Sequence, residues 1–223
     1  MFVIAFGVAF VLTWMFGYKD AAQAGQNVKG EAGSSSDNNV SEKAESAKAV
    51  EASETATTTV AADGVSDTKS AGIPDLYSAL TGTAIPLSQV NDATFASEVL
   101  GKGIAVIPEK GEVVAPCDAT VETVFDTKHA VGMSTESGVE LLIHIGINTV
   151  ELGGKYYTTH VKDGDQVKKG QLLVSFDMDK IKEAGYDVTT PLIVTNSDDY
   201  RDVKILHEGM VTPEDKVLEI VKE

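Results

Sequence analysis

The chain is poor in cysteine and in basic residues, and each scarcity argues against a class of protein. Its 223 residues include one cysteine, Cys117, which excludes an internal disulfide framework and a multi-cysteine metal site. There are 18 lysines and arginines against 34 aspartates and glutamates, so the formal net charge is −16. This argues against nucleic acid as the main partner, because phosphate backbones are bound by clustered basic side chains. It suits a partner with a basic docking face.

Familiar catalytic motifs are also missing. The sequence has no GxxxxGK[ST] or GxGxxG, so it shows no nucleotide site, and we expect no cofactor. It has no GxSxG for a seryl nucleophile, and no HExxH, His-x-His or His-x-x-x-Asp pattern typical of zinc hydrolases. Its candidates for chemistry are therefore the four histidines, His129, His144, His160 and His207.

Residues 1–18 carry no charged side chain, and Trp14 and Tyr18 lie near their C-terminal end. As a helix they would reach about 27 Å, close to the roughly 30 Å of a hydrocarbon core. We favour a transmembrane helix, the last one of a larger membrane protein. A secretory signal peptide is the alternative, since Ala22-Gln23-Ala24 resembles a cleavage site, although no basic residue precedes the apolar run.

Residues 19–73 contain no Phe, Trp, Tyr or Leu. Such a segment cannot bury enough apolar surface to offset the entropy of ordering. It predicts a flexible linker with a reach on the order of 40 Å. A domain at its end would stay near the membrane and meet partners at high effective concentration.

Residues 74–223 have the features of an all-β domain, a sandwich or barrel of short strands separated by turn residues. The expected strands are the apolar runs 103–107, 121–125, 139–147, 171–176, 191–195 and 217–221. Helix is expected only as single turns at 93–99, capped by Asp92, and at 178–184.

His144 lies in the run Leu141-Leu142-Ile143-His144-Ile145-Gly146-Ile147. Strand alternation places the odd-numbered residues on a core face and His144 beside Gly146 on the other face, where the glycine leaves room for another group. A core histidine bonded to a backbone carbonyl is the simpler interpretation.

His129 follows Phe125-Asp126-Thr127-Lys128, at the expected end of a strand whose hairpin returns through 139–147. Adjacent strands would bring His129 and His144 face to face. Two facing imidazoles suit a zinc site, an acid–base pair, or a phosphoryl acceptor with a hydrogen-bonding partner.

Several stretches resemble the glucose-type IIA domains of the bacterial phosphoenolpyruvate-dependent sugar phosphotransferase system, and their order and spacing agree across essentially all of 76–223. They are GKGIAVIPEKGEVVAPCDATV (101–121), FDTKHAVGMSTESGVELLIHIGINTVELGG (125–154), VKDGDQVKKGQLLVSFD (161–177), TPLIVTN (190–196) and VLEIVK (217–222). AFVLTWMFGYKD (9–20) resembles the end of the IIC domain in β-glucoside or sucrose-type permeases of B-C-A order.

This resemblance implies a β-sandwich of the duplicated hybrid motif type and a IIA phosphocarrier domain in the cytoplasm at 74–223. It implies that His144 accepts a phosphoryl group from the phosphocarrier protein HPr and passes it to the cysteine of a IIB domain. His129 matches the histidine that hydrogen-bonds the phosphoryl group, and Thr127 matches the threonine that orients the pair. Specificity for the sugar would reside in IIB and IIC.

One position departs from the family pattern, because Asn148 stands where members usually carry aspartate. We expect Cys117 to be buried and inert, His160 and His207 to be solvated, and Phe125 to lie either on a docking face or in the core. Two alternatives remain. One is a secreted zinc endopeptidase of the lysostaphin type, and the other is a regulatory module that binds partners according to phosphorylation.

Overall fold

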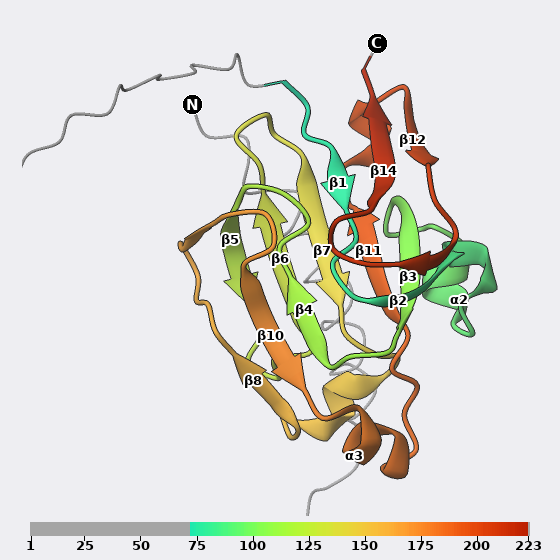
Figure 1. The fold of residues 1–223 in the computed structure, drawn as a ribbon, viewed down its shortest axis with the longest axis vertical. Coiled ribbons are helices and arrows are strands. Elements are labelled where there is room, and N and C mark those ends of the chain that lie inside the picture. Colours follow the sequence, from blue (N-terminus) through green and yellow to red (C-terminus); the bar gives the residue numbers. More distant parts are fainter. Residues whose placement is uncertain (1–71, 223) are drawn as a thin grey trace, which may run out of the picture.

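A computed structural model describes residues 72–222, which form an antiparallel β domain with short helical turns (Figure 1). The predicted membrane helix at 1–18, and all but the last two residues of the predicted linker at 19–73, lie outside this range. Ile73 packs against the main core. Among residues 72–222, no helix has the length and apolarity that a membrane crossing requires.

The strands form three sheets, and every strand pair is antiparallel. The large sheet has the order β13(Gly209–Val211), β2(Gly82–Pro86), β3(Lys102–Pro108), β11(Thr190–Val194), β7(Glu140–His144), β6(Ala130–Ser134), β5(Ala119–Val124), β9(Gln166–Val167). The second has the order β4(Glu112–Val114), β10(Leu172–Phe176), β8(Tyr157–Thr159). The third has the order β1(Leu76–Tyr77), β14(Lys216–Val221), β12(Asp202–Ile205).

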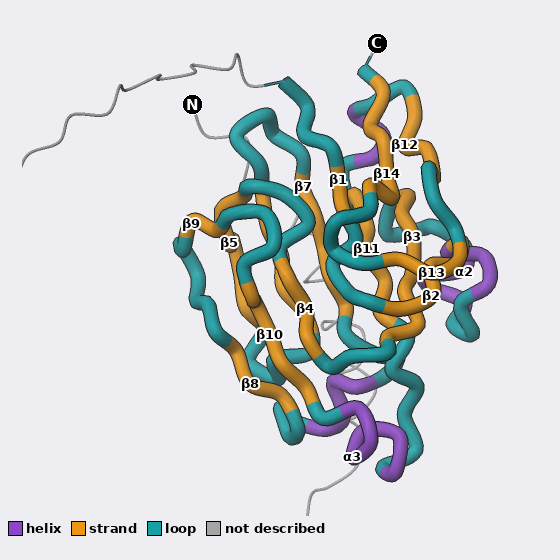
Figure 2. The backbone as a smooth tube through the Cα atoms, viewed as in Figure 1, coloured by secondary structure: helices purple, strands orange, loops and turns teal. Residues whose placement is uncertain are grey.

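Both faces of the large sheet are covered, which explains why its central strands are buried throughout. All five residues of β7 and all five of β11 are buried. Figure 2 shows β4 and β10 lying over β5, β6 and β7, and each of these strands contributes buried side chains to one cluster. This main core cluster unites apolar residues of all three sheets, among them Leu76, Ile104, Val121, Leu141, Ile143, Leu173, Leu192 and Leu218.

A second core cluster lies on the opposite face of the large sheet. Its members are Leu87, Val90, Phe95, Leu100, Ala105, Ala130, Leu142, Ile147 and Ile193. Strand alternation sorts the residues, since Leu192 and Val194 of β11 enter the main cluster and Ile193 enters the second. The cover on this side comes from 87–100, which contains η1(Leu87–Gln89) and α2(Ala93–Ala96).

The structure confirms both predicted helical turns and shortens them. The side chain of Asp92 caps α2 by accepting from the backbone N–H groups of Thr94 and Phe95, as the sequence predicts. This helix ends at Ala96 rather than near Val99, and Glu98 then has a φ of 56°. The other turn is α3(Met178–Glu183).

Two strand predictions were wrong in detail. Strand β5 ends at Val124, and His129 lies directly before a strand the sequence analysis missed, β6. A turn separates the two strands, with Lys128 at a φ of 57° and its N–H donating to the Phe125 carbonyl at 2.7 Å. The expected strand 139–147 becomes β7, which ends at His144.

Ile147 consequently lies on the other side from the one predicted. Alternation assigned it to the face of Leu141 and Ile143, but it packs with Leu142 in the second core cluster. Gly146 has a φ of 81°, so regular strand geometry stops before Ile147. Ile145 still enters the main cluster, as expected.

Candidate active site

The β6–β7 hairpin brings His129 and His144 together. Ala130 is the register partner of His144, and the N–H of Ile145 donates to the His129 carbonyl at 2.6 Å. The imidazole centroids are 4.8 Å apart with an interplanar angle of 79°. His129 is 0% exposed and His144 is 4% exposed. The predicted juxtaposition is therefore present, although it arises from β6 and β7 rather than from β5 and β7.

His144 is held in one tautomer by its own backbone. Nδ1 lies 2.8 Å from the carbonyl oxygen of Gly146. A carbonyl only accepts hydrogen bonds, so Nδ1 carries the hydrogen. In the neutral ring, Nε2 then keeps its lone pair and is the nucleophilic nitrogen.

Gly146 is required for this turn. Its φ is 81°, and a Cβ at this position would lie 2.6 Å from Cγ2 of Thr149 and 2.8 Å from the carbonyl oxygen of Asp187. The sequence analysis took this glycine to leave room for another group. That interpretation was wrong, because the protein's own chain fills the space.

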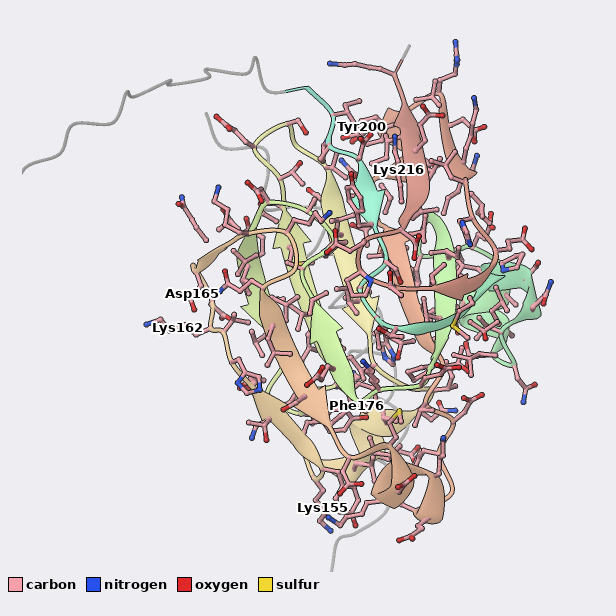
Figure 3. The ribbon with its side chains drawn as sticks, viewed as in Figure 1. Lys155, Lys162, Asp165, Phe176, Tyr200 and Lys216 are labelled. Atoms are coloured by element: carbon pink, nitrogen blue, oxygen red, sulfur yellow. The ribbon has the colours of Figure 1, made fainter. Side chains whose placement is uncertain are left out.

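The carbonyl before Gly146 is also fixed. The hydroxyls of Thr149 and Tyr157 both donate to the Ile145 carbonyl, at 2.7 Å and 3.1 Å. The Tyr157 ring stacks on Phe176, labelled in Figure 3, with centroids 6.1 Å apart and an interplanar angle of 24°. Two buried side chains therefore fix the Ile145 carbonyl, at the start of the turn whose Gly146 carbonyl contacts His144.

Thr127 contacts the second histidine, since its Oγ1 lies 2.6 Å from Nδ1 of His129. If the hydroxyl donates, the neutral His129 ring carries its hydrogen on Nε2. Thr127 lies in the tight turn between β5 and β6, two residues before His129, so the local backbone brings the two side chains together.

Aromatic rings flank the histidine pair. Phe95 of α2 lies 5.0 Å from the His144 ring, and Phe125 lies 5.4 Å from the His129 ring, edge on. Phe125 is half-buried and packs against the second core cluster, so it takes part in the core. Sequence reasoning did not assign Phe95 to the site. The available signal was its position three residues after the Asp92 cap, which orients α2.

Burial keeps both histidines neutral. Desolvation lowers the pKa of His144 to about 4, and this is only partly offset by the hydrogen bond to Gly146 and by the charge of Asp92. Desolvation, followed by repulsion from His144, lowers the pKa of His129 to about 3. At neutral pH the site presents two uncharged imidazoles, one of them a ready nucleophile.

The structure also places the other residues that the sequence analysis singled out. His160 and His207 are exposed, as predicted, and bond to Oγ of Ser175 and to the Met210 carbonyl. Cys117 is buried, also as predicted, and desolvation raises the pKa of its thiol to about 12. Asn148 is exposed in the left-handed region, with a φ of 59°. Within 72–222, no three His, Cys, Asp or Glu side chains are grouped to hold a metal ion.

Together, the fold and the site define a class: an antiparallel β domain that holds two buried, neutral imidazoles side by side. The family described as "phosphoenolpyruvate-dependent sugar phosphotransferase system, EIIA 1" matches residues 74–200, and the chain belongs to that family. The described domain is therefore a IIA domain of this phosphotransferase system, as the resemblance implied. The comparisons support neither the zinc endopeptidase nor the regulatory module.

Several relatives agree with this membership. The chain is 48% identical over 143 residues to the beta-glucoside-specific EIIBCA component of Bacillus subtilis, covering 64% of this chain and 24% of that protein. The Dickeya chrysanthemi protein of the same name is 52% identical over 136 residues, covering 61% and 22%. The chain thus spans about a quarter of the length of these relatives.

Shorter relatives match over most of their length. The glucose-specific EIIA component of Oceanobacillus iheyensis is 46% identical over 143 residues, covering 64% of this chain and 87% of that protein. The solved structure of glucose permease IIA from Mycoplasma capricolum has a TM-score of 0.60 and 35% identity, covering 64% of this chain and 92% of that one. This likeness supports the predicted β-sandwich for the described domain.

Proposed function

We propose that Nε2 of His144 is the atom that carries the phosphoryl group. The observation that supports this most strongly is the 2.8 Å bond from Nδ1 to the Gly146 carbonyl, which leaves the lone pair on Nε2. The low pKa of His144 keeps that lone pair unprotonated at neutral pH. A buried neutral imidazole is thereby ready to attack without a general base.

In the proposed step, Nε2 attacks the phosphorus of a phosphohistidine on HPr. The new N–P bond forms as the donor's N–P bond breaks, and the donor imidazole leaves with that electron pair. The His144 ring keeps its Nδ1 hydrogen and acquires positive charge, which the Gly146 carbonyl stabilises. Passing the group to the cysteine thiolate of a IIB domain reverses this change and restores the neutral ring.

We assign His129 the role of donor to the phosphoryl group. When the Thr127 hydroxyl donates to Nδ1, the His129 hydrogen is on Nε2, in a ring whose centroid is 4.8 Å from that of His144. Phosphoryl transfer passes through a loose transition state with charge on the equatorial oxygens, so catalysis consists of alignment and charge stabilisation. His129 and Thr127 serve both purposes without accepting a proton.

The partners in this proposal follow from the relatives and from the charge. Two beta-glucoside-specific EIIBCA components are 48% and 52% identical, which supports IIB and IIC domains of a β-glucoside-type permease as the partners downstream. The chain has a net charge of −16, which favours a phosphoryl donor with a basic docking face. We place the domain on the cytoplasmic side of the membrane.

The direct test supplies the full chain with phosphoenolpyruvate, enzyme I and HPr and measures acid-labile, base-stable phosphate. Wild type should be labelled, His144→Ala should not be, and His129→Gln should be labelled but slow in onward transfer. His160→Ala, which alters an exposed histidine, is the matched control and should behave as wild type. Labelling of His144→Ala at the wild-type level would refute the proposal.

We also propose that residues 1–18 anchor the chain in a membrane, because they are uncharged and end at Lys19 and Asp20. Extraction of membranes at high pH should leave the full chain in the pellet and release a variant that lacks 1–18. Release of both proteins would contradict the anchor.

A further inference from the structure

The nucleophilic nitrogen of His144 is selected by a single peptide group, the one that joins Gly146 to Ile147. Its carbonyl accepts from Nδ1 of His144 at 2.8 Å. Its N–H, which belongs to Ile147 and points the opposite way within the peptide plane, donates to the carbonyl of Asp187 at 2.8 Å. Because a peptide group is planar and rigid, the direction of its N–H fixes the direction of its carbonyl.

Asp187 itself is held in place by two hydrogen bonds to its side chain. Its Oδ1 accepts from the backbone N–H of Thr189 at 2.8 Å and from the Thr189 hydroxyl at 2.7 Å. Thr189 is buried and directly precedes β11, which pairs with β7 beside the site. The carboxylate therefore ties the loop after α3 to a rigid strand, and this sets where the Asp187 carbonyl points.

Close packing makes this contact specific to the Gly146 turn. The Asp187 carbonyl oxygen would be 2.8 Å from a Cβ at Gly146, so the loop occupies the space that a side chain would need. A chain of dipoles runs from the Asp187 carbonyl through the peptide to the imidazole hydrogen. Each bond in such a chain polarises the next one, which strengthens the bond to Nδ1.

We propose that Asp187 is a positioning residue for His144, acting through its main-chain carbonyl and the Gly146–Ile147 peptide to keep the hydrogen on Nδ1 and the lone pair on Nε2. The carboxylate does not contact the reacting atoms. Its function is to hold the loop, so an uncharged side chain with the same acceptor should replace it. The effect on transfer rests on the proposed function of His144, whereas the effect on the tautomer does not.

The first readout is the tautomer of the unphosphorylated ring. The full chain is labelled with ¹⁵N in its four histidines, and NMR identifies which His144 nitrogen bears the hydrogen at neutral pH. Wild type should show Nδ1–H, and Asp187→Ala should lower the ratio of the two tautomers about tenfold, the size expected for losing one or two hydrogen bonds. Thr189→Val, which removes only the hydroxyl bond, should shift the ratio in the same direction by less.

Two variants separate positioning from charge and from general loosening. Asp187→Asn keeps the acceptor oxygen without the charge, and it should restore the wild-type ratio. Asp215→Ala is the matched control, because Asp215 accepts from the N–H and hydroxyl of Thr212 in the same way, at 2.7 Å and 2.8 Å, in the turn before β14. It should lower stability comparably and leave the His144 ratio unchanged.

The second readout is the rate of phosphoryl acceptance, expected to fall about tenfold in Asp187→Ala and to recover in Asp187→Asn. An unchanged tautomer ratio in Asp187→Ala would overturn the inference. So would a defect in Asp187→Asn as large as in Asp187→Ala, or an equal shift in Asp215→Ala. A wild-type chain that shows Nδ1–H but takes no phosphoryl group would refute the proposed function and leave the positioning role standing.

Discussion

The two faces of the large sheet are buried by different means. One face is covered by two further sheets and contributes to a continuous apolar core. The other is covered by 87–100, whose Leu87, Val90, Phe95 and Leu100 meet a smaller set of sheet residues. Both histidines of the site belong to this second side, with Phe95 against His144. The comparison indicates that the main core cluster supplies stability, and the second supplies a low-dielectric site close to the surface.

The largest effect on stability should come from the main core cluster. Leu173 of β10 is completely buried there. Leu173→Ala should reduce the free energy of unfolding by about 2–5 kcal/mol, because it removes apolar burial and leaves a cavity. Denaturant titration of the full chain measures this, and phosphoryl acceptance per folded molecule should stay at the wild-type value. A loss of acceptance without a loss of stability would contradict the division between the faces.

Gly146→Ala should affect stability less and activity more. The left-handed backbone costs a non-glycine residue about 1–3 kcal/mol, and the new Cβ would displace Thr149 or the Asp187 loop. We expect acceptance to fall at least about tenfold, since the Gly146 carbonyl moves away from Nδ1. Gly170→Ala is the matched control, with a φ of 79° and nothing near its Cβ. If it slows acceptance equally, backbone strain alone explains the result.

The buried imidazoles predict a pH dependence of stability. Both histidines have folded-state pKa values below the usual 6.5, at about 3 and about 4. The unfolded chain therefore binds more protons than the folded one between about pH 6.5 and pH 4. The contribution of these histidines to the free energy of unfolding is fully present above this window and is lost as pH drops through it. Each histidine contributes a slope of up to about 1.4 kcal/mol per pH unit.

Urea titrations across this window, compared with the double variant His129→Gln/His144→Gln, isolate the contribution of the two histidines. Groups such as Glu140, whose pKa is raised by burial, affect both proteins and cancel in the difference. Parallel curves for the two proteins would show that the histidines are not buried as neutral groups.

The smallest effect should come from Thr127, which lies at the edge of the site. Thr127→Val removes the 2.6 Å bond to His129 and should slow onward transfer about fivefold, the size of one hydrogen bond of about 1 kcal/mol. Thr127→Ser keeps the hydroxyl and should restore the rate. A serine variant as slow as the valine variant would indicate that the methyl group, rather than the hydroxyl, matters.

The sequence predicts those parts of the molecule that local rules determine. The apolar run around His144 and the Asp92 cap each depend on neighbouring residues, and both are confirmed. The resemblance also predicted the family, which the family match over 74–200 confirms. The pairing of His129 with His144 was also anticipated, although through the wrong strand, because β6 has the short and weakly apolar sequence AVGMS.

The features that the sequence did not predict depend on contacts between distant segments of the chain. Phe95 and Asp187 reach His144 and Gly146 only after the sheet is assembled. No local pattern marks a carbonyl as a partner, so Asp187 cannot be recognised from its position in the sequence. The same limit explains Ile147, whose side chain changes face because Gly146 packs against that distant carbonyl.

The most direct test of the central claim is to identify the phosphorylated nitrogen. The full chain, labelled with ¹⁵N in its histidines, is phosphorylated through enzyme I and HPr, and the coupling between ³¹P and ¹⁵N is read by NMR. The account predicts one N–P bond, at Nε2 of His144, with the hydrogen on Nδ1. A phosphoryl group on Nδ1 of His144, or on any other residue, would contradict it.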